Sequence, residues 1–243
     1  MKNKEKKKKG YRLLIFIAVL LFLAGLIVML FPVFTNWLYG KEVEQQKQAF
    51  VQQIEKAEKV SASDTSVLPF DELYQELKRR NEELFLTRQT DLKDPFSYQQ
   101  PTIDLSEYGL GGNIIGFISI PKMEVELPIL LGANTDNMRE GAVHLTETSY
   151  PIGGENTNCV LAAHRGFRRA AMFRDIEMLE IGDEIYIRNF RETLTYRVAE
   201  LRVISPTDVQ ELLIQPERDL VTLITCHPYR HNYQRYVVYC ERV

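Results

Sequence analysis

The sequence has 243 residues, enough for one folded domain with appendages, and its 45% hydrophobic and 26% charged residues are ordinary proportions for a folded protein. The formal net charge of −3 hides an asymmetry, because seven of the first 12 residues are basic and only one is acidic, which leaves 23 basic and 32 acidic residues elsewhere. An acidic body argues against a nucleic-acid partner.

The first element that we expect is a membrane-spanning helix. Residues 13–31 carry no charged or polar side chain, and as a helix they would span roughly 28 Å, close to the hydrocarbon thickness of a bilayer. The basic tail at residues 1–12 favours a cytoplasmic N-terminus, so we expect a single-pass anchor at residues 13–33 and an extracellular body. A cleaved signal peptide is the alternative, although the apolar run exceeds the usual length and no small-x-small site follows it.

An N-terminal helical segment is expected at residues 41–87. Two stretches within it, residues 41–60 and 71–87, have apolar side chains at helical spacing. These are Val43, Phe50, Val51, Ile54 and Ala57 in the first stretch and Leu73, Leu77 and Leu84 in the second. We interpret both as packing or spacer helices, with a partner-binding coiled coil as the alternative.

A long irregular loop at residues 88–101 is followed by a region of β character. Short apolar segments fall at residues 114–120, 124–130, 158–164, 184–190, 193–204, 220–226 and 235–240, with a short helix expected near 170–179. Many short strands at close spacing predict a mainly β domain over residues 103–243, built as a sandwich or a closed barrel.

Three side chains with useful chemistry lie at the ends of predicted strands. His164 and Cys226 each end an apolar segment, and Arg235 opens the last one. A thiolate can attack a carbonyl, an imidazole can move protons, and a fixed cation can stabilise an oxyanion, so the three groups suffice for acyl transfer. Taken singly, a strand-end cysteine is more often a small buried hydrophobe, and the spacing alone does not decide between these interpretations.

The segment Thr-Leu-Ile-Thr-Cys at residues 222–226 resembles the Thr-Leu-x-Thr-Cys signature of the sortases, with His164 and Arg235 at the positions where that family has its histidine and arginine. The resemblance implies an eight-stranded β-barrel with short helices, in which the Cys226 strand lies between the other two. It also implies that Cys226 forms the acyl-enzyme, that His164 is the general acid and base, and that Arg235 holds the substrate and the oxyanion. Thr225 would contribute to the oxyanion site, and no cofactor is implied.

The irregular loop at residues 88–101 carries a second motif. Asp94-Pro95-Phe96 resembles the Asp-Pro-aromatic lid of class C, pilin-polymerising sortases. The resemblance implies that Asp94 faces the arginine and that Phe96 covers the cysteine until the lid moves. An ordinary turn that contains proline is the alternative. The Cys-His-Pro-Tyr segment that begins at Cys226 also resembles class C.

The class C resemblance implies cleavage of a Leu-Pro-x-Thr-Gly-like signal in one pilin and transfer to a lysine amine of another. The alternatives are a housekeeping sortase that uses a peptidoglycan precursor and a non-catalytic pilus assembly or adhesion module. Two features depart from class C. The sequence stops at Val243, where those proteins usually have a second hydrophobic segment, so the chain is either single-pass or shortened. Arg230 stands where they often have glycine.

The remaining cysteines and histidines point to no further site. Cys159 and Cys240 are expected on strands that flank the nucleophile's strand, roughly 9–10 Å apart, which is beyond the reach of a disulfide, so we expect free thiols. His144, His227 and His231 have no acid or cysteine at ligand spacing, and no metal site is predicted.

Overall fold

The computed structural model describes residues 2–61, 69–90, 92, 99–167 and 170–243, with the side chains of residues 2–11, 13, 60 and 61 left out. Two compact units can be distinguished, one that holds the chain up to Lys41 and one that holds most of the chain from Glu42 onward. Each unit is described by itself.

The N-terminal unit is helical, as part of helix α1 (Lys2–Ser61). The expected anchor at residues 13–33 and the expected helix at residues 41–60 are joined in this one helix, which includes Pro32. The Thr35 hydroxyl donates to the Pro32 carbonyl at 3.0 Å, three residues before it in the helix. The stretch that starts at Leu14 is exposed, long and apolar enough to cross a membrane.

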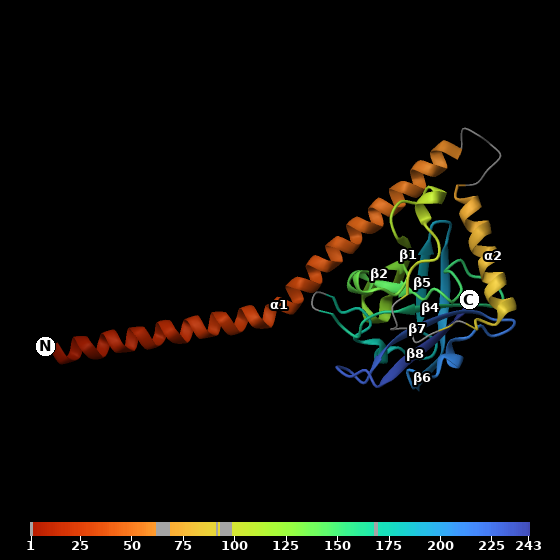
Figure 1. Ribbon diagram of the computed structural model, residues 1–243. Coiled ribbons are helices and arrows are strands. Elements are labelled where there is room, and N and C mark those ends of the chain that lie inside the picture. Colours follow the sequence, from red (N-terminus) through yellow and green to blue (C-terminus); the bar gives the residue numbers. More distant parts are fainter. Residues whose placement is uncertain (1, 62–68, 91, 93–98, 168–169) are drawn as a thin grey trace. The chain divides into compact units, whose positions relative to one another are not determined.

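Two helical segments pack in the second unit (Figure 1). In the last part of α1, Phe50 is buried and meets Phe117 edge-on, with ring centroids 5.6 Å apart. Helix α2 (Asp71–Thr87) has the predicted bounds and buries Leu73 and Leu77. Both segments are helical and bury apolar side chains, as packing helices would.

The second unit is built on a closed eight-stranded barrel, with the strand order β1-β2-β3-β4-β7-β8-β6-β5. The strands are β1 (Ile114–Ile120), β2 (Val125–Leu131), β3 (Ala142–His144), β4 (Thr157–Ala162), β5 (Glu184–Asn189), β6 (Thr193–Ile204), β7 (Asp219–His227) and β8 (Gln234–Arg242). The β2–β3 and β4–β7 pairs are parallel and the others are antiparallel. The barrel prediction is confirmed.

Short helical elements precede β1 or lie between strands. They are α3 (Thr135–Glu140) and the 3-10 turns η1 (Leu105–Tyr108), η2 (Pro121–Met123), η3 (Ile176–Met178) and η4 (Val209–Leu212). The helix expected near residues 170–179 was wrong in extent, because only the turn η3 forms there. The strand expected at residues 158–164 ends at Ala162, so His164 lies in the following loop.

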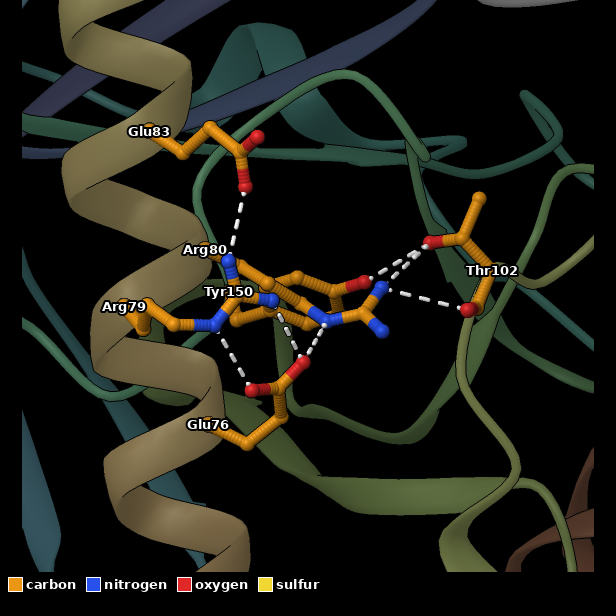
Figure 2. Close-up of polar contacts among 6 residues, drawn as sticks. All are labelled: Glu76, Arg79, Arg80, Glu83, Thr102 and Tyr150. Carbon is orange, nitrogen blue, oxygen red and sulfur yellow. Dashed lines mark hydrogen bonds and ion pairs between the residues drawn. The ribbon is translucent and has the colours of Figure 1, made fainter.

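A polar cluster joins helix α2 to Thr102, which follows the segment of residues 88–101 (Figure 2). Arg80 donates to the Thr102 carbonyl at 3.1 Å, and the Thr102 hydroxyl lies 2.9 Å from the Tyr150 hydroxyl. On the helix itself, hydrogen bonds from Arg79 and Arg80 lower the pKa of Glu76 to about 2. The position of residue 102 is therefore set by α2 and by the barrel together.

Candidate active site

Strand β7 lies between β4 and β8, as the resemblance implied. Cys226 on β7 is the register partner of Arg235 on β8, and Ile224 is the partner of Ala162 on β4. Because β4 and β7 are parallel and β8 is antiparallel to β7, the ends of β4 and β7 and the start of β8 share one end of the barrel. Cys226, Arg235 and His164, which lies two residues beyond β4, are thus brought to that end.

Two hydrogen bonds join the chain before His164 to the chain before Cys226. The Ala163 N–H donates to the Ile224 carbonyl at 3.2 Å, and the Thr225 hydroxyl donates to the Ala163 carbonyl at 2.7 Å. Thr225 is fully buried, and its hydroxyl hydrogen is engaged in this bond. Its side chain therefore ties β7 to the loop that carries His164, and a direct contribution to the oxyanion stays a prediction.

Cys226 and Arg235 share one face of the sheet with a buried cluster. Residues two apart on a strand point to the same face, so Cys226 is on the side of Ile224, and Arg235 is on the side of Val237. Both Ile224 and Val237 belong to a buried apolar cluster whose other members are Leu92, Ala133, Met138, Val143, Leu145, Val160, Ala162, Ile204, Leu212 and Tyr239. The half-buried Cys226 is therefore at the rim of an apolar layer.

His164 is half-buried in the loop after β4. Its ring stacks on Phe167, with centroids 5.2 Å apart and planes 16° apart, and its carbonyl accepts from the Phe173 N–H at 3.1 Å. Burial lowers the pKa of His164 because the charged imidazolium loses hydration. At neutral pH this favours a neutral ring, which is the form that can accept a proton from a thiol.

Arg235 is buried at the start of β8 and is anchored to its own loop. Its Nη1 donates to the carbonyls of Asn232 at 2.7 Å and Gln234 at 3.1 Å. A guanidinium remains charged in proteins and carries five N–H donors. These bonds therefore place a fixed positive charge opposite Cys226 in the strand register.

A second arginine, Arg165, lies beside the backbone of Cys226, and sequence reasoning missed it. Its Nη1 donates to His227 Nδ1 at 2.8 Å and lies 3.5 Å from the Cys226 carbonyl oxygen, and its Nη2 lies 2.5 Å from a carboxylate oxygen of Glu177. The only signal in the sequence was that Arg165 follows His164. Nothing in the sequence pointed to Glu177, which lies on the short turn η3.

The β7–β8 loop contains the second departure from class C. Arg230 has φ of +67°, which is the left-handed region that favours glycine. The structure thus gives Arg230 the conformation that suits the glycine of the class C pattern. The Arg230 guanidinium lies 5.5 Å from the centre of the exposed Tyr229 ring.

The lid motif Asp94, Pro95 and Phe96 lies outside the described residues, but its flanks are described. On one side Leu92 packs in the buried cluster, and on the other the Gln99 N–H donates to the carbonyl of Ala133, another member of that cluster, at 2.9 Å. Both flanks are therefore attached to the layer that carries Cys226.

The other two cysteines lie deeper in the barrel. Cys159 and Cys240 are the register partners of Val221 on its two sides, and both are buried free thiols, as predicted. Burial raises the pKa of each thiol, and the charge of Asp219 adds to the effect at Cys159.

The remaining histidines have structural neighbours. His144 is fully buried, its Nε2 lies 3.1 Å from the carbonyls of Thr148 and Ser149, and burial lowers its pKa to about 4. His231 lies beside Tyr233 in the β7–β8 loop. Within the described part of the chain, no three His, Cys, Asp or Glu side chains group in a way that could hold a metal ion.

The chain is similar to known proteins both in sequence and in fold. The family model described as Sortase domain matches residues 118–243. The chain is 30% identical to Sortase D of Bacillus subtilis (strain 168), over 54% of the chain and 65% of that protein, just under two thirds of its length. It is 31% identical to Sortase A of Bacillus anthracis, over 70% of the chain and 83% of that protein.

Among solved structures, the fold is similar to Sortase C1 of GBS Pilus Island 1, from group B Streptococcus. The TM-score is 0.72 and the sequence identity is 28%, over 82% of this chain and 98% of that chain. The similarity therefore extends over nearly the whole of that structure.

Proposed function

Because the chain belongs to the sortase family of cysteine transpeptidases, we propose that it cleaves a Leu-Pro-x-Thr-Gly-like sorting signal and transfers the acyl group to a lysine amine of a pilin. The observation that carries the proposal is the register that sets Cys226 opposite Arg235 at the barrel end where His164 follows β4. The similarity to a sortase named for a pilus island supports a pilin substrate.

The first step is acylation of Cys226. Its sulfur attacks the carbonyl carbon of the signal's threonine while His164 takes the thiol proton, and Arg235 stabilises the negative charge that develops on the carbonyl oxygen. The Thr–Gly bond then breaks, and His164 returns the proton to the departing glycine amine. A thioester between the threonine carbonyl and Cys226 remains.

The second step transfers the acyl group. A lysine amine attacks the thioester carbon and His164 accepts a proton from that amine. The carbon–sulfur bond breaks, and the sulfur of Cys226 leaves with the proton as a thiol. An amide bond between the threonine carbonyl and the lysine side chain is the product, and the enzyme is regenerated without a cofactor.

The proposed location is the outer face of the cell membrane. The exposed apolar part of α1 supports a membrane anchor or a signal sequence, and the basic residues before it favour a cytoplasmic N-terminus. We propose that the helix is retained as a single-pass anchor, with the barrel outside the cell. Mass spectrometry of the chain from isolated membranes checks this, since a mature N-terminus after residue 33 would contradict it.

The lid remains a proposal that rests on the sequence motif and on its described flanks. With Asp94 facing Arg235 and Phe96 over Cys226, access of a peptide to the thiol would be blocked. The variant Asp94→Ala should then cleave a soluble signal peptide faster than the wild type. An unchanged rate would contradict an inhibitory lid and would leave the turn interpretation.

The nature of the acceptor decides between the proposed function and its nearest alternative. The full chain in detergent is incubated with a sorting-signal peptide and either a pilin that carries accessible lysines or a peptidoglycan stem peptide. The proposal predicts an isopeptide-linked product with the pilin. Transfer only to the stem peptide would support the wall-anchoring alternative, and no acylation of either the wild type or the Asp94→Ala variant would support a non-catalytic module.

A further inference from the structure

The two reacting residues are bracketed by contacts between their neighbours. The residues that directly precede the two are joined by a hydrogen bond from the Thr225 hydroxyl to the Ala163 carbonyl, at 2.7 Å. After them, Arg165 donates to His227 Nδ1 at 2.8 Å. The contacts therefore join residues 163 and 225 on one side of the His164 and Cys226 pair and residues 165 and 227 on the other.

We propose that Arg165, with Glu177 as its counter-charge, is a positioning residue that holds the backbone of Cys226 in place relative to His164. This inference rests on the proposed function, because it concerns the same reaction. Arg165 is covalently next to His164, and its Nη1 lies 3.5 Å from the Cys226 carbonyl oxygen. One side chain thus connects the loop of the proton-transfer group to the strand of the nucleophile.

The burial of Arg165 indicates that its contacts are part of the folded structure and are not chance contacts of a surface side chain. Its side chain is 4% exposed, whereas that of Glu177 is 48% exposed. A buried guanidinium is tolerated when it is paired and hydrogen-bonded, and removal of its partner leaves a charge that is costly to bury. Glu177 supplies that partner, with Oε2 on Arg165 Nη2 at 2.5 Å and Oε1 at 3.1 Å from His227 Nδ1.

The ring of His227 completes the arrangement. Its Nδ1 lies 2.8 Å from Arg165 Nη1, which can only donate, and 3.1 Å from Glu177 Oε1, which can only accept. The ring also packs beside Tyr236, with centroids 5.6 Å apart. His227 is therefore held from three sides, directly after the nucleophile.

Arg165 and Glu177 also place opposite charges beside the Cys226 carbonyl and the His227 ring. Charged or titratable groups on the neighbouring elements include His164 after β4, His227 on β7, and Arg235 and Tyr236 on β8. A cation near a thiol favours the thiolate, and an anion disfavours it. Loss of Arg165 and loss of Glu177 should therefore shift the ionisation of Cys226 in opposite directions, which a purely structural role would not do.

The test compares four variants of the full chain in detergent. Arg165→Met removes the charge and the hydrogen bonds, Arg165→Lys keeps the charge without the fork of donors, and Glu177→Gln removes the counter-charge. Arg197→Met is the control, because Arg197 forms an exposed pair with Glu184 at 2.9 Å and is the register partner of Glu241, at the end of β8 away from Arg235. The readouts are the rate of acyl-enzyme formation with a signal peptide, the pH dependence of Cys226 alkylation by iodoacetamide, and the thermal midpoint.

The proposal predicts about 10- to 100-fold slower acylation for Arg165→Met, with partial recovery in Arg165→Lys and no change in Arg197→Met. The pH of half-maximal alkylation should rise in Arg165→Met and fall in Glu177→Gln. Wild-type acylation by Arg165→Met, or shifts of the same sign in both variants, would overturn the proposal.

If Arg165→Met does not fold, the other two variants decide. A lowered alkylation pH in Glu177→Gln, together with slower acylation in Arg165→Lys than in the wild type, supports the proposal, and the absence of either overturns it. Failure of the proposed function is seen separately, because the wild type itself would then form no acyl-enzyme while the alkylation shifts would still report on Arg165.

Discussion

Strand β7 has two regions in which cysteine thiols have different environments. Around Val221, the flanking strands contribute Cys159 and Cys240, both fully enclosed. Five residues further along, the strand reaches the barrel end, where the half-buried Cys226 lies opposite Arg235. The reactivity of a thiol in this fold therefore depends on its distance along the strand from the open end.

Electrostatics explains the difference between these regions. The thiolate is the nucleophile, and burial raises the pKa of Cys159 and Cys240, so neither thiol ionises readily. Cys226 instead lies where the loop after β4 and the start of β8 bring His164 and Arg235 to the same end. The first region stabilises the barrel, and the second provides the proposed chemistry.

The largest effect is expected from removal of each thiol in turn. Cys226→Ala should slow cleavage of a signal peptide by at least about 1,000-fold, because the nucleophile is lost and no neighbour can replace it. Cys159→Ala and Cys240→Ala serve as matched controls and should cleave within about 3-fold of the wild type, measured by chromatography of the peptide. Substantial cleavage by Cys226→Ala would contradict the claim that the reactive thiol lies at the barrel end and not in the buried region.

The next effect concerns alkylation of the native chain. Iodoacetamide at pH 8 should modify Cys226 at least about 100-fold faster than Cys159 or Cys240, because the latter two are buried and resist ionisation. Peptide mapping by mass spectrometry after a time course gives the three rates. In denaturant the rates should become similar, and a native chain with three similar rates would contradict the comparison.

The buried His144 extends the comparison to acid stability. His144 is fully buried with a pKa of about 4, so as the pH falls below about 6.5 the unfolded chain takes up this proton before the folded chain does. The free energy of unfolding should decrease between pH 6.5 and 4, by up to ~3 kcal/mol from this group. Chemical denaturation of His144→Gln should show a shallower decrease than the wild type, and equal slopes would contradict the assignment.

The smallest effect is expected at the open end of β7. Arg230 adopts a positive φ that costs a residue with a side chain about 1–2 kcal/mol, and the greater freedom of glycine in the unfolded chain offsets about half of the relief. Arg230→Gly should therefore raise the free energy of unfolding by about 0.5 kcal/mol, measured by denaturation. Arg230→Ala, which keeps the strain, should not, and a destabilised Arg230→Gly would show that the left-handed conformation costs little here.

Much of the barrel could be predicted because its strands are regular and apolar. The expected bounds of residues 114–120 and 193–204 match β1 and β6, and the stretch of residues 71–87 matches α2. Strand β3 was missed because three residues are too few to show a period. The single helix α1 was predicted as two separate elements. The residues between these elements form neither a long apolar run nor an apolar stripe at helical spacing, so neither criterion predicts a helix there.

The candidate active-site residues also differ in how far the sequence predicts them. His164, Cys226 and Arg235 could be proposed from sequence because each lies near a strand end, and strand order then sets their proximity. Glu177 could not, because its contact with Arg165 joins two loops whose paths no sequence period describes.

The central claim is that Cys226 carries the acyl group, and intact-mass spectrometry tests it most directly. The full chain in detergent is mixed with a sorting-signal peptide and quenched in acid, and the modified residue is located by peptide mapping. The account predicts a hydroxylamine-sensitive adduct on Cys226, with the mass of the peptide up to its threonine, and none in Cys226→Ala. An adduct on Cys159 or Cys240, or cleavage of the peptide without any adduct on Cys226, would contradict it.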